Sequence, residues 1–232
     1  MDIRIESLIE GAARAEGAVA IIDVFRAFTT AAVAFANGAT HITMVASVEE
    51  ALSLRDRGAG QICMGEVGGR PPESFDFGNS PYDLSQADLS GKAIIQRTSA
   101  GTQGIVTAAK AAQHMFAASL VTASATVGAM HSVAADRITL VAMGDEGRRR
   151  SSEDEICALY LRNLLEGRQG NPEAARQMIL SGGEVAKFGD VSRPWLNPND
   201  VPLALDIDRY DFAIKVEMEN GYPVARKFGE RG

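Results

Sequence analysis

The sequence predicts an α/β fold with a mainly parallel sheet. Apolar runs typical of strands alternate with helical patterns at least five times along the chain. The first run, Ala18–Asp23, is apolar without interruption until its final carboxylate. A strand with one solvated face would alternate apolar and polar residues, so this run indicates a strand covered on both faces, as in parallel sheets. With 232 residues, 46% of them hydrophobic, the chain can form a full core without disulfides or metals.

The first half of the chain gives three strands and two helices. The strands are predicted at Ala18–Asp23, His41–Val45 and Gln61–Met64, and the helices at Arg26–Asn37 and Ser47–Arg57. The second helix has a capping box, because Ser47 is followed three residues later by Glu50. Gly38 and Gly58 stop the two helices.

The second half continues the alternation and ends in a hairpin. Strands are predicted at Lys92–Gln96, His114–Ala118 and Arg137–Ala142, and helices from the Arg97–Thr102 loop to Ala112, near Ser124–Ala135, over Ser151–Glu166 and from Asn171-Pro172. Ser152 and Glu155 form a second possible capping box, and Leu196–Pro202 is expected to be irregular. Phe212–Met218 and Pro223–Lys227 are predicted to pair as a hairpin. We expect one domain over residues 1–232, in which residues 170–232 either belong to the main body or form an added layer.

The segment from Gly65 to Pro81 is the most unusual part of the sequence. Its glycines and prolines exclude a helix or a ladder strand. Charged residues and Asn79 alternate with Phe75 and Phe77, which favours a packed loop over a disordered one. We interpret it as an active-site loop.

Composition excludes several classes of function. The net charge of −7 argues against nucleic-acid binding, which needs a basic face. We find no signal peptide and no apolar run near the roughly 18 residues of a membrane span. Cys63 and Cys157 lie in apolar runs and are expected to be buried free thiols of a cytoplasmic protein. The sequence leaves both a monomer and a homodimer open.

Polar residues follow the predicted strands where ligands bind in open parallel sheets, at the carboxyl ends. Asp23 closes the first strand and Arg26 opens the next helix, so a carboxylate lies beside a partner for phosphate. Asp23 would serve equally well as a helix N-cap. The Arg97–Thr102 loop offers hydroxyls and backbone amides for an anion, although an ordinary capped turn has the same composition.

A third polar segment, Gly144–Glu155, mixes five carboxylates with three arginines. It is either a solvated charged turn with helix-capping acids or a source of metal and phosphate contacts. The residues that would make those contacts are Glu146, Arg148, Glu153 and Asp154. Carboxylates without a His or Cys cluster favour Mg²⁺ over zinc. A serine hydrolase is disfavoured because no Gly-x-Ser-x-Gly motif is present.

Taken together, these loops resemble the 2-phosphosulfolactate phosphatase family. The resemblance rests on Ile22-Asp-Val-Phe-Arg-Ala-Phe-Thr-Thr30, Ala36-Asn-Gly-Ala39, Val45-Ala-Ser-Val-Glu-Glu-Ala51, Phe75-Asp-Phe-Gly-Asn-Ser-Pro81 and Thr98-Ser-Ala-Gly-Thr102. Gly144-x-x-Gly147 with Ser152-Glu-Asp154 looks like the family's second acidic motif. The resemblance implies a three-layer α/β/α fold and an Mg²⁺-dependent phosphatase that releases sulfolactate and phosphate in coenzyme M biosynthesis.

On this basis we expect Asp23, Arg26 and Glu66 to be catalytic, with Asp23 either a nucleophile or a metal ligand. Mg²⁺ would be held by Asp23 and Glu66, with Asp154 or Asp76. The expected substrate-binding residues are Asp76, Asn79, Ser80, Arg97, Thr98, Ser99, Gly101, Thr102 and Arg148.

Three alternative functions would use similar residues. A haloacid-dehalogenase-type phosphatase requires Asp-x-Asp after the first strand, and Phe25 stands in the second position. A protein that binds an anionic phosphorylated metabolite without turnover would retain the same motifs. A metal-dependent lyase or aldolase would use a similar site and would release a carbonyl product instead of phosphate.

Overall fold

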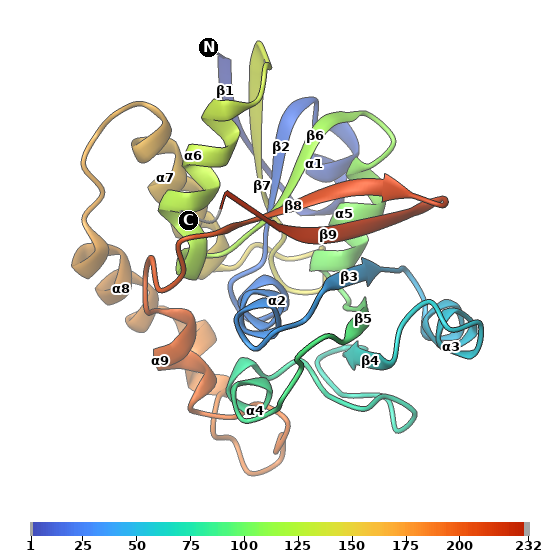
Figure 1. Cartoon of the computed structure of the whole chain (residues 1–232). Coiled ribbons are helices and arrows are strands. Elements are labelled where there is room, and N and C mark those ends of the chain that lie inside the picture. Colours follow the sequence, from blue (N-terminus) through green and yellow to red (C-terminus); the bar gives the residue numbers. More distant parts are fainter. Residues whose placement is uncertain (1, 230–232) are drawn as a thin grey trace.

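The computed structural model describes residues 2–229, whose strands form one nine-stranded sheet in the order β1-β7-β2-β6-β8-β9-β3-β5-β4 (Figure 1). The strands are β1 Asp2–Ser7, β2 Gly17–Ile22, β3 His41–Met44, β4 Ile62–Gly65, β5 Ala93–Arg97, β6 Ala112–Ala118, β7 Arg137–Ala142, β8 Ala213–Glu219 and β9 Tyr222–Phe228. The helices are α1 Leu8–Arg14, α2 Ala27–Ala36, α3 Val48–Asp56, α4 Pro81–Ser85, α5 Gly101–Ala108, α6 Ala123–Ser132, α7 Ser152–Leu165, α8 Pro172–Leu180 and α9 Asp200–Ala204, with 3₁₀ turns η1 Leu120–Thr122 and η2 Gly183–Lys187.

The sheet consists of two parallel blocks joined by the C-terminal hairpin. β1, β7, β2 and β6 run parallel to one another, as do β3, β5 and β4. The hairpin β8–β9 lies between the blocks, and each of its strands pairs antiparallel with its neighbours. The predicted α/β class with a mainly parallel sheet is confirmed. The hairpin is confirmed too, and it is an internal part of the sheet.

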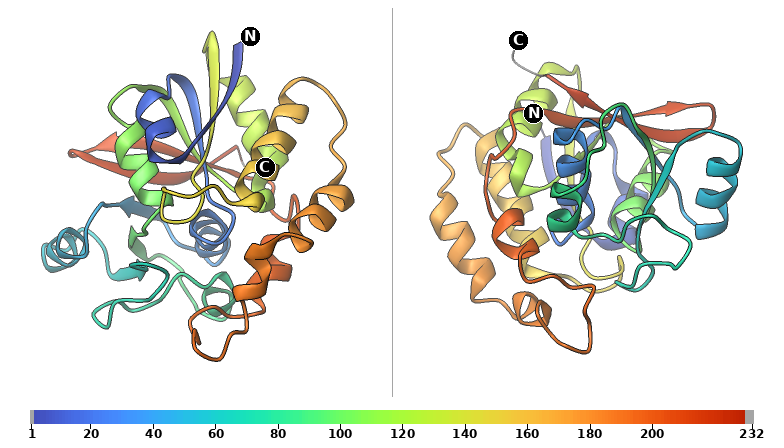
Figure 2. Two further views of the ribbon diagram at one scale, coloured as in Figure 1. Left: turned by 180° about the vertical axis from the view of Figure 1, so that it is seen from behind. Right: turned by 60° about the horizontal axis from the view of Figure 1, so that its bottom comes forward.

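Both faces of the sheet are covered, as the apolar run in β2 predicts. Val19 and Ile21 pack into one core cluster with residues of α2 and α5. Ala18, Ala20 and Ile22 face the opposite cluster, which contains residues of α6 and α7. Seen from behind in Figure 2, α7 to α9 flank the strands on one side and α1 with α5 on the other. Among residues 2–229, no helix is long and apolar enough to cross a membrane.

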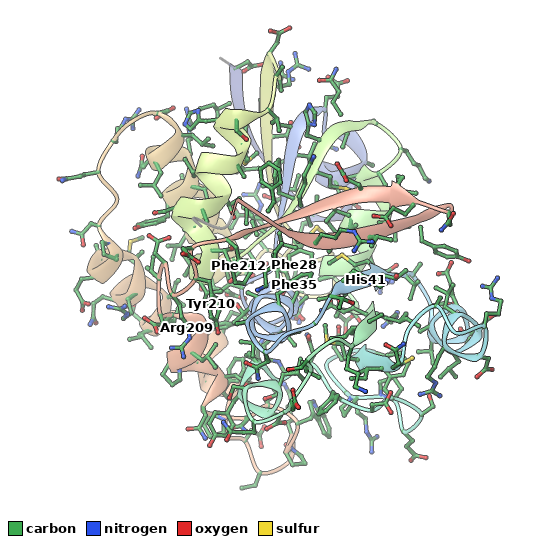
Figure 3. All side chains as sticks on the ribbon, in the orientation of Figure 1. Phe28, Phe35, His41, Arg209, Tyr210 and Phe212 are labelled. Carbon is green, nitrogen blue, oxygen red and sulfur yellow. The ribbon has the colours of Figure 1, made fainter. Side chains whose placement is uncertain are left out.

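Helix α2 is at the centre of the molecule. Every residue from Ala27 to Phe35 is buried, so the helix contacts protein on all sides. In Figure 3, Phe35 lies close to Phe212 below the hairpin. Phe35 meets Phe212 edge-on with ring centroids 6.4 Å apart, and Phe212 stacks on Tyr210. This burial fixes the N-terminal end of α2, which carries the residues that follow β2.

Several sequence predictions require correction. The helix expected to reach Ala112 ends at Ala108, and Ala112 already begins β6. Part of the segment Leu196–Pro202 is helical, because α9 begins at Asp200. Ser47 caps α3 as predicted, accepting a hydrogen bond from the Glu50 amide.

The two remaining helix starts differ from each other. Asn171 caps α8, as predicted, by accepting a hydrogen bond from the Ala174 amide. The proposed capping box of Ser152 and Glu155 does not form, because Glu155 accepts from the Ser7 hydroxyl instead. The edge strand β1 and the helices α1 and α4 were not predicted.

Candidate active site at the carboxyl ends of the strands

A pocket lies where the loops after β2, β4, β5 and β7 meet, and the segment from η2 to α9 forms its remaining wall. Within three residues of the end of each of these strands, a polar side chain lines the pocket. These side chains are Asp23, Glu66, Ser99 and Asp145. These loops are far apart in the sequence and belong to two parallel blocks that run in opposite directions, yet residues of all four loops line the same pocket. Five carboxyl groups line the pocket, from Asp23, Glu66, Asp145, Glu146 and Glu153. The two cationic side chains that line it are Arg26 and Lys187.

Asp23 is buried at the start of α2, and its Oδ1 accepts a hydrogen bond of 3.0 Å from the Ala27 amide. Burial raises the pKa of Asp23 to about 6, and the negative charge of Glu66 adds to this, while the amides of Ala27 and Gly101 act in the opposite direction. Only glycine fits at position 101, because a Cβ there would lie 2.9 Å from Oδ2 of Asp23. The predicted role of Asp23 as a cap of α2 is therefore confirmed by the hydrogen bond from the Ala27 amide. It does not exclude a chemical role, since the side chain also lines the pocket.

Glu66 is directed into the pocket by the glycine that precedes it. Gly65 has a φ of 134°, and a Cβ there would lie 1.8 Å from the Arg97 carbonyl oxygen. The chain can therefore pass close to β5 before it turns. Oε1 of Glu66 then accepts from the Ser99 amide at 2.5 Å, and Oε2 accepts from the Gly69 amide at 2.5 Å and the Ser99 hydroxyl at 3.1 Å. These bonds fix the carboxylate before any ligand arrives.

The donors of the Arg97–Thr102 loop are used within the protein. The Ser99 amide binds Glu66, and the Gly101 amide stabilises the charged form of Asp23. Thr98 and Thr102 bind each other, since each amide donates to the other residue's hydroxyl, at 2.8 and 3.0 Å. The anion that the sequence predicts at this helix start is therefore provided by two of the protein's own carboxylates. Contact of these residues with substrate stays a prediction.

Arg26 is 4% exposed, and its guanidinium lies over the Phe188 ring, 5.9 Å from the ring centroid. Its Nη1 donates to Oδ2 of Asp200 at 2.9 Å and to the Trp195 carbonyl oxygen at 2.7 Å. Asp200 in turn accepts from the Ser80 hydroxyl at 2.6 Å. Within residues 2–229 both of these hydrogen bonds use Nη1, and the Arg26 side chain also lines the pocket. Ser80 thus acts on the site through Asp200.

Asp154 lies behind the pocket and ties two of its loops together. Its Oδ1 accepts from the Val24 amide at 2.7 Å and its Oδ2 from the Gly144 amide at 2.8 Å. Burial raises its pKa well above the usual value, and the charges of Glu153 and Asp23 raise it further. Glu153 itself lines the pocket; burial raises its pKa to about 7, and its Oε2 has no hydrogen-bond partner in the described part of the chain.

The other predicted residues lie in different places. Asn79 lines the pocket with an unpartnered Oδ1, again considering residues 2–229. Arg97 supports the site from outside, donating to the carbonyl oxygens of Glu66 and Ala46. Asp76 points away from the pocket, toward the Cys63 amide and Arg55.

Arg148 is exposed and does not line the pocket. Sequence reasoning overlooked Lys187, Phe188 and Asp200, all on the segment from η2 to α9. In the sequence, this segment is marked only by polar and aromatic residues that lie close together without a helical or strand periodicity.

The charges of the pocket suit a hard divalent cation. Asp23 and Glu66, two of the three predicted metal ligands, line it together, whereas Asp154 lies behind it. Within residues 2–229 no group of three or more His, Cys, Asp or Glu side chains could hold a metal by itself. Mg²⁺ is commonly bound through one or two carboxylates, with waters and substrate phosphate as its other ligands. The residues present therefore fit such an ion.

Fold and site define an α/β protein with an acidic pocket at the ends of its strands. A family model described as 2-phosphosulpholactate phosphatase matches residues 3–186, and the chain belongs to this family. Similar proteins named "Probable 2-phosphosulfolactate phosphatase" come from several organisms. The relative from Bacillus subtilis is 30% identical over 210 residues, 89% of this chain and 90% of its own length. Those from Thermotoga petrophila and Thermus thermophilus are 39% and 35% identical, over 71% and 56% of this chain and 70% and 54% of their own lengths.

Proposed function

We propose that this chain is a phosphoric monoester hydrolase that cleaves 2-phosphosulfolactate, or a related small anionic phosphomonoester, to the hydroxy acid and phosphate. Membership of the family supports the reaction class. The observation that carries the proposal is the fixed pair of carboxylates, Asp23 and Glu66, that shares a pocket with the half-engaged guanidinium of Arg26. With the sulfonated substrate, the reaction would supply sulfolactate to coenzyme M biosynthesis. The buried free thiols of Cys63 and Cys157 support a cytoplasmic location.

The proposal includes dependence on Mg²⁺. Five carboxyl groups against two cations would repel a phosphate dianion, so substrate binding requires additional positive charge. Asp23 and Glu66 would hold the ion, which when bound would neutralise phosphate charge and orient the attacking group. Asp154 would position the loops after β2 and β7 through its two amide contacts.

The protein's own residues have distinct tasks in this scheme. Nε and Nη2 of Arg26 would donate to two phosphate oxygens, a geometry to which the planar guanidinium is suited. Asp200 and the Trp195 carbonyl hold that guanidinium in place. Asp23 would act as a ligand or as the nucleophile. A burst of hydroxy acid ahead of phosphate would identify the nucleophile, because an aspartyl phosphate would then accumulate.

The test is phosphate release from 2-phosphosulfolactate and a panel of small phosphomonoesters, with and without Mg²⁺. We expect magnesium-dependent release that is strongest for the sulfonated ester. Release from other esters alone would keep the reaction and reject the substrate. If no ester releases phosphate while sulfolactate still binds, the chain is a binding protein for anionic metabolites and the proposed hydrolysis is wrong.

A further inference from the structure

The two cations of the pocket differ in how far the protein has already engaged them. Arg26 forms a fully buried ion pair with Asp200, with exposed fractions of 4% and 0% for the two side chains. Lys187 comes from the last residue of η2, and 26% of its side chain is exposed. One cation is thus built into the wall, whereas the other is at its accessible edge.

The only ion pair of Lys187 within residues 2–229 is a local one. Its Nζ lies 2.6 Å from Oε2 of Glu184, three residues earlier, where side chains of a 3₁₀ turn lie above one another. Glu184 is itself 29% exposed. Such pairs near the surface contribute little to stability, so a ligand anion can replace Glu184 at little cost.

Lys187 also faces the reacting end of the pocket. Its charge acts on both Asp23 and Glu153, lowering the pKa of each against the larger effect of burial. Phe188, the next residue, packs edge-on against Phe25 with ring centroids 5.2 Å apart. This contact fixes the backbone at Lys187 against the loop after β2. The ammonium group is therefore held near the pocket while its side chain keeps some freedom.

We propose that Lys187 determines substrate specificity by binding a second acidic group, a carboxylate or a sulfonate, on a ligand whose phosphate is bound at Arg26. The inference rests on the proposed function and deepens it by naming the residue that binds the second acidic group of the substrate. Arg26 directly precedes α2 and Lys187 ends η2, so the two cations stand on separate elements and can bind two separate anionic groups of one ligand. Lys187 lies just beyond the family match at residues 3–186.

The experiment compares the binding of two ligands that need no turnover. Calorimetric titration with sulfolactate and with inorganic phosphate, in Mg²⁺, would be made on the wild type, Lys187→Met, Lys187→Arg and Lys110→Met. Lys110 is exposed and follows the C-terminal end of α5, whereas the pocket lies at the opposite end of that helix. Its replacement controls for the loss of one positive charge.

We expect Lys187→Met to weaken sulfolactate binding at least 10-fold and phosphate binding less than 2-fold, with Lys187→Arg close to the wild type. Lys110→Met should change neither. Equal loss for both ligands, unchanged sulfolactate binding, or no sulfolactate binding by the wild type would each overturn the inference.

A kinetic arm separates the inference from the proposed function. Lys187→Met should raise KM for 2-phospholactate and leave kcat and the KM for isopropyl phosphate, which lacks the carboxylate, nearly unchanged. A fall in kcat with both esters would assign Lys187 to the reaction itself and overturn the specificity role. If the wild type hydrolyses neither ester, the proposed function fails, and the binding titrations still decide the role of Lys187.

Discussion

The two walls of the pocket are built in different ways. The wall from the strand ends presents Asp23 and Glu66, both buried and both hydrogen-bonded to backbone amides. The wall from the C-terminal segment presents Lys187 and Phe188, which are half-buried and held by side-chain contacts. Groups fixed by backbone donors suit chemistry, because their geometry does not have to reorganise during reaction. Groups held by weak side-chain pairs suit recognition, because a ligand can take over those pairs.

The largest expected effect comes from removing a charge of the strand-end wall. Asp23→Asn keeps the size of the side chain but loses a ligand for a cation, so we expect phosphatase activity to fall by about 10³-fold or more. Asp76→Asn is the matched control, since Asp76 points toward Arg55 and the Cys63 amide. It should change activity less than 3-fold. A fully active Asp23→Asn protein would remove the chemical role from this wall.

The predictions for Asp23 and Glu66 agree with the pocket lining, whereas that for Asp76 does not, and the reason lies in the sequence context of each residue. Asp23 and Glu66 were predicted because each follows a strand identified by its apolar run, and the carboxyl ends of strands are where α/β sheets bind ligands. Asp76 was predicted to face the same site, but its side chain points away from the pocket. In a long loop the orientation of each side chain depends on tertiary contacts. Here the partner is Arg55 of α3, which no local pattern in the loop reveals.

Elements were missed for a related reason. β1 alternates polar and apolar residues at the sheet edge, a pattern that the charge of the chain start concealed. Lys187 and Asp200 lie in η2 and α9, each of five residues, too short for a helical periodicity to be recognised. The C-terminal wall is therefore the part that only the three-dimensional structure reveals.

The ion pairs of the two regions should differ most in stability. Asp200→Ala leaves the buried guanidinium of Arg26 without its carboxylate, and breaking such a pair costs about 3–5 kcal/mol of unfolding free energy. Asp76→Ala breaks the exposed pair with Arg55 and should cost about 0–1 kcal/mol for the ion pair. Urea unfolding of both variants measures the difference. Equal losses would mean that Arg26 does not depend on Asp200.

Asp23 should make the protein less stable as pH rises, when no divalent cation is present. Its pKa in the folded state is about 6, above the ordinary aspartate value of 3.8, so the folded protein binds the proton more tightly than the unfolded chain. That stabilisation is complete below pH 3.8 and is lost as pH rises through 6. The difference corresponds to about 3 kcal/mol.

Asp23→Asn carries no such charge, so its unfolding free energy in EDTA should exceed that of the wild type at pH 7.5 by up to about 3 kcal/mol. The advantage should shrink as pH falls toward 4, and added Mg²⁺ should stabilise the wild type only. Chemical unfolding at several pH values checks this. If Asp23→Asn is less stable than the wild type at pH 7.5, the charge of Asp23 does not destabilise the folded protein.

The smallest effect concerns Glu184, which competes with a ligand anion for Lys187. If the C-terminal wall recognises ligands by exchanging a weak pair, Glu184→Gln should tighten sulfolactate binding. The gain cannot exceed the strength of the pair, about 0–1 kcal/mol, which corresponds to at most about 5-fold in affinity. Phosphate binding should not change. Weaker sulfolactate binding by Glu184→Gln would mean that Glu184 positions Lys187 instead of competing for it. The charged groups of both walls would then be fixed by the protein before a ligand binds.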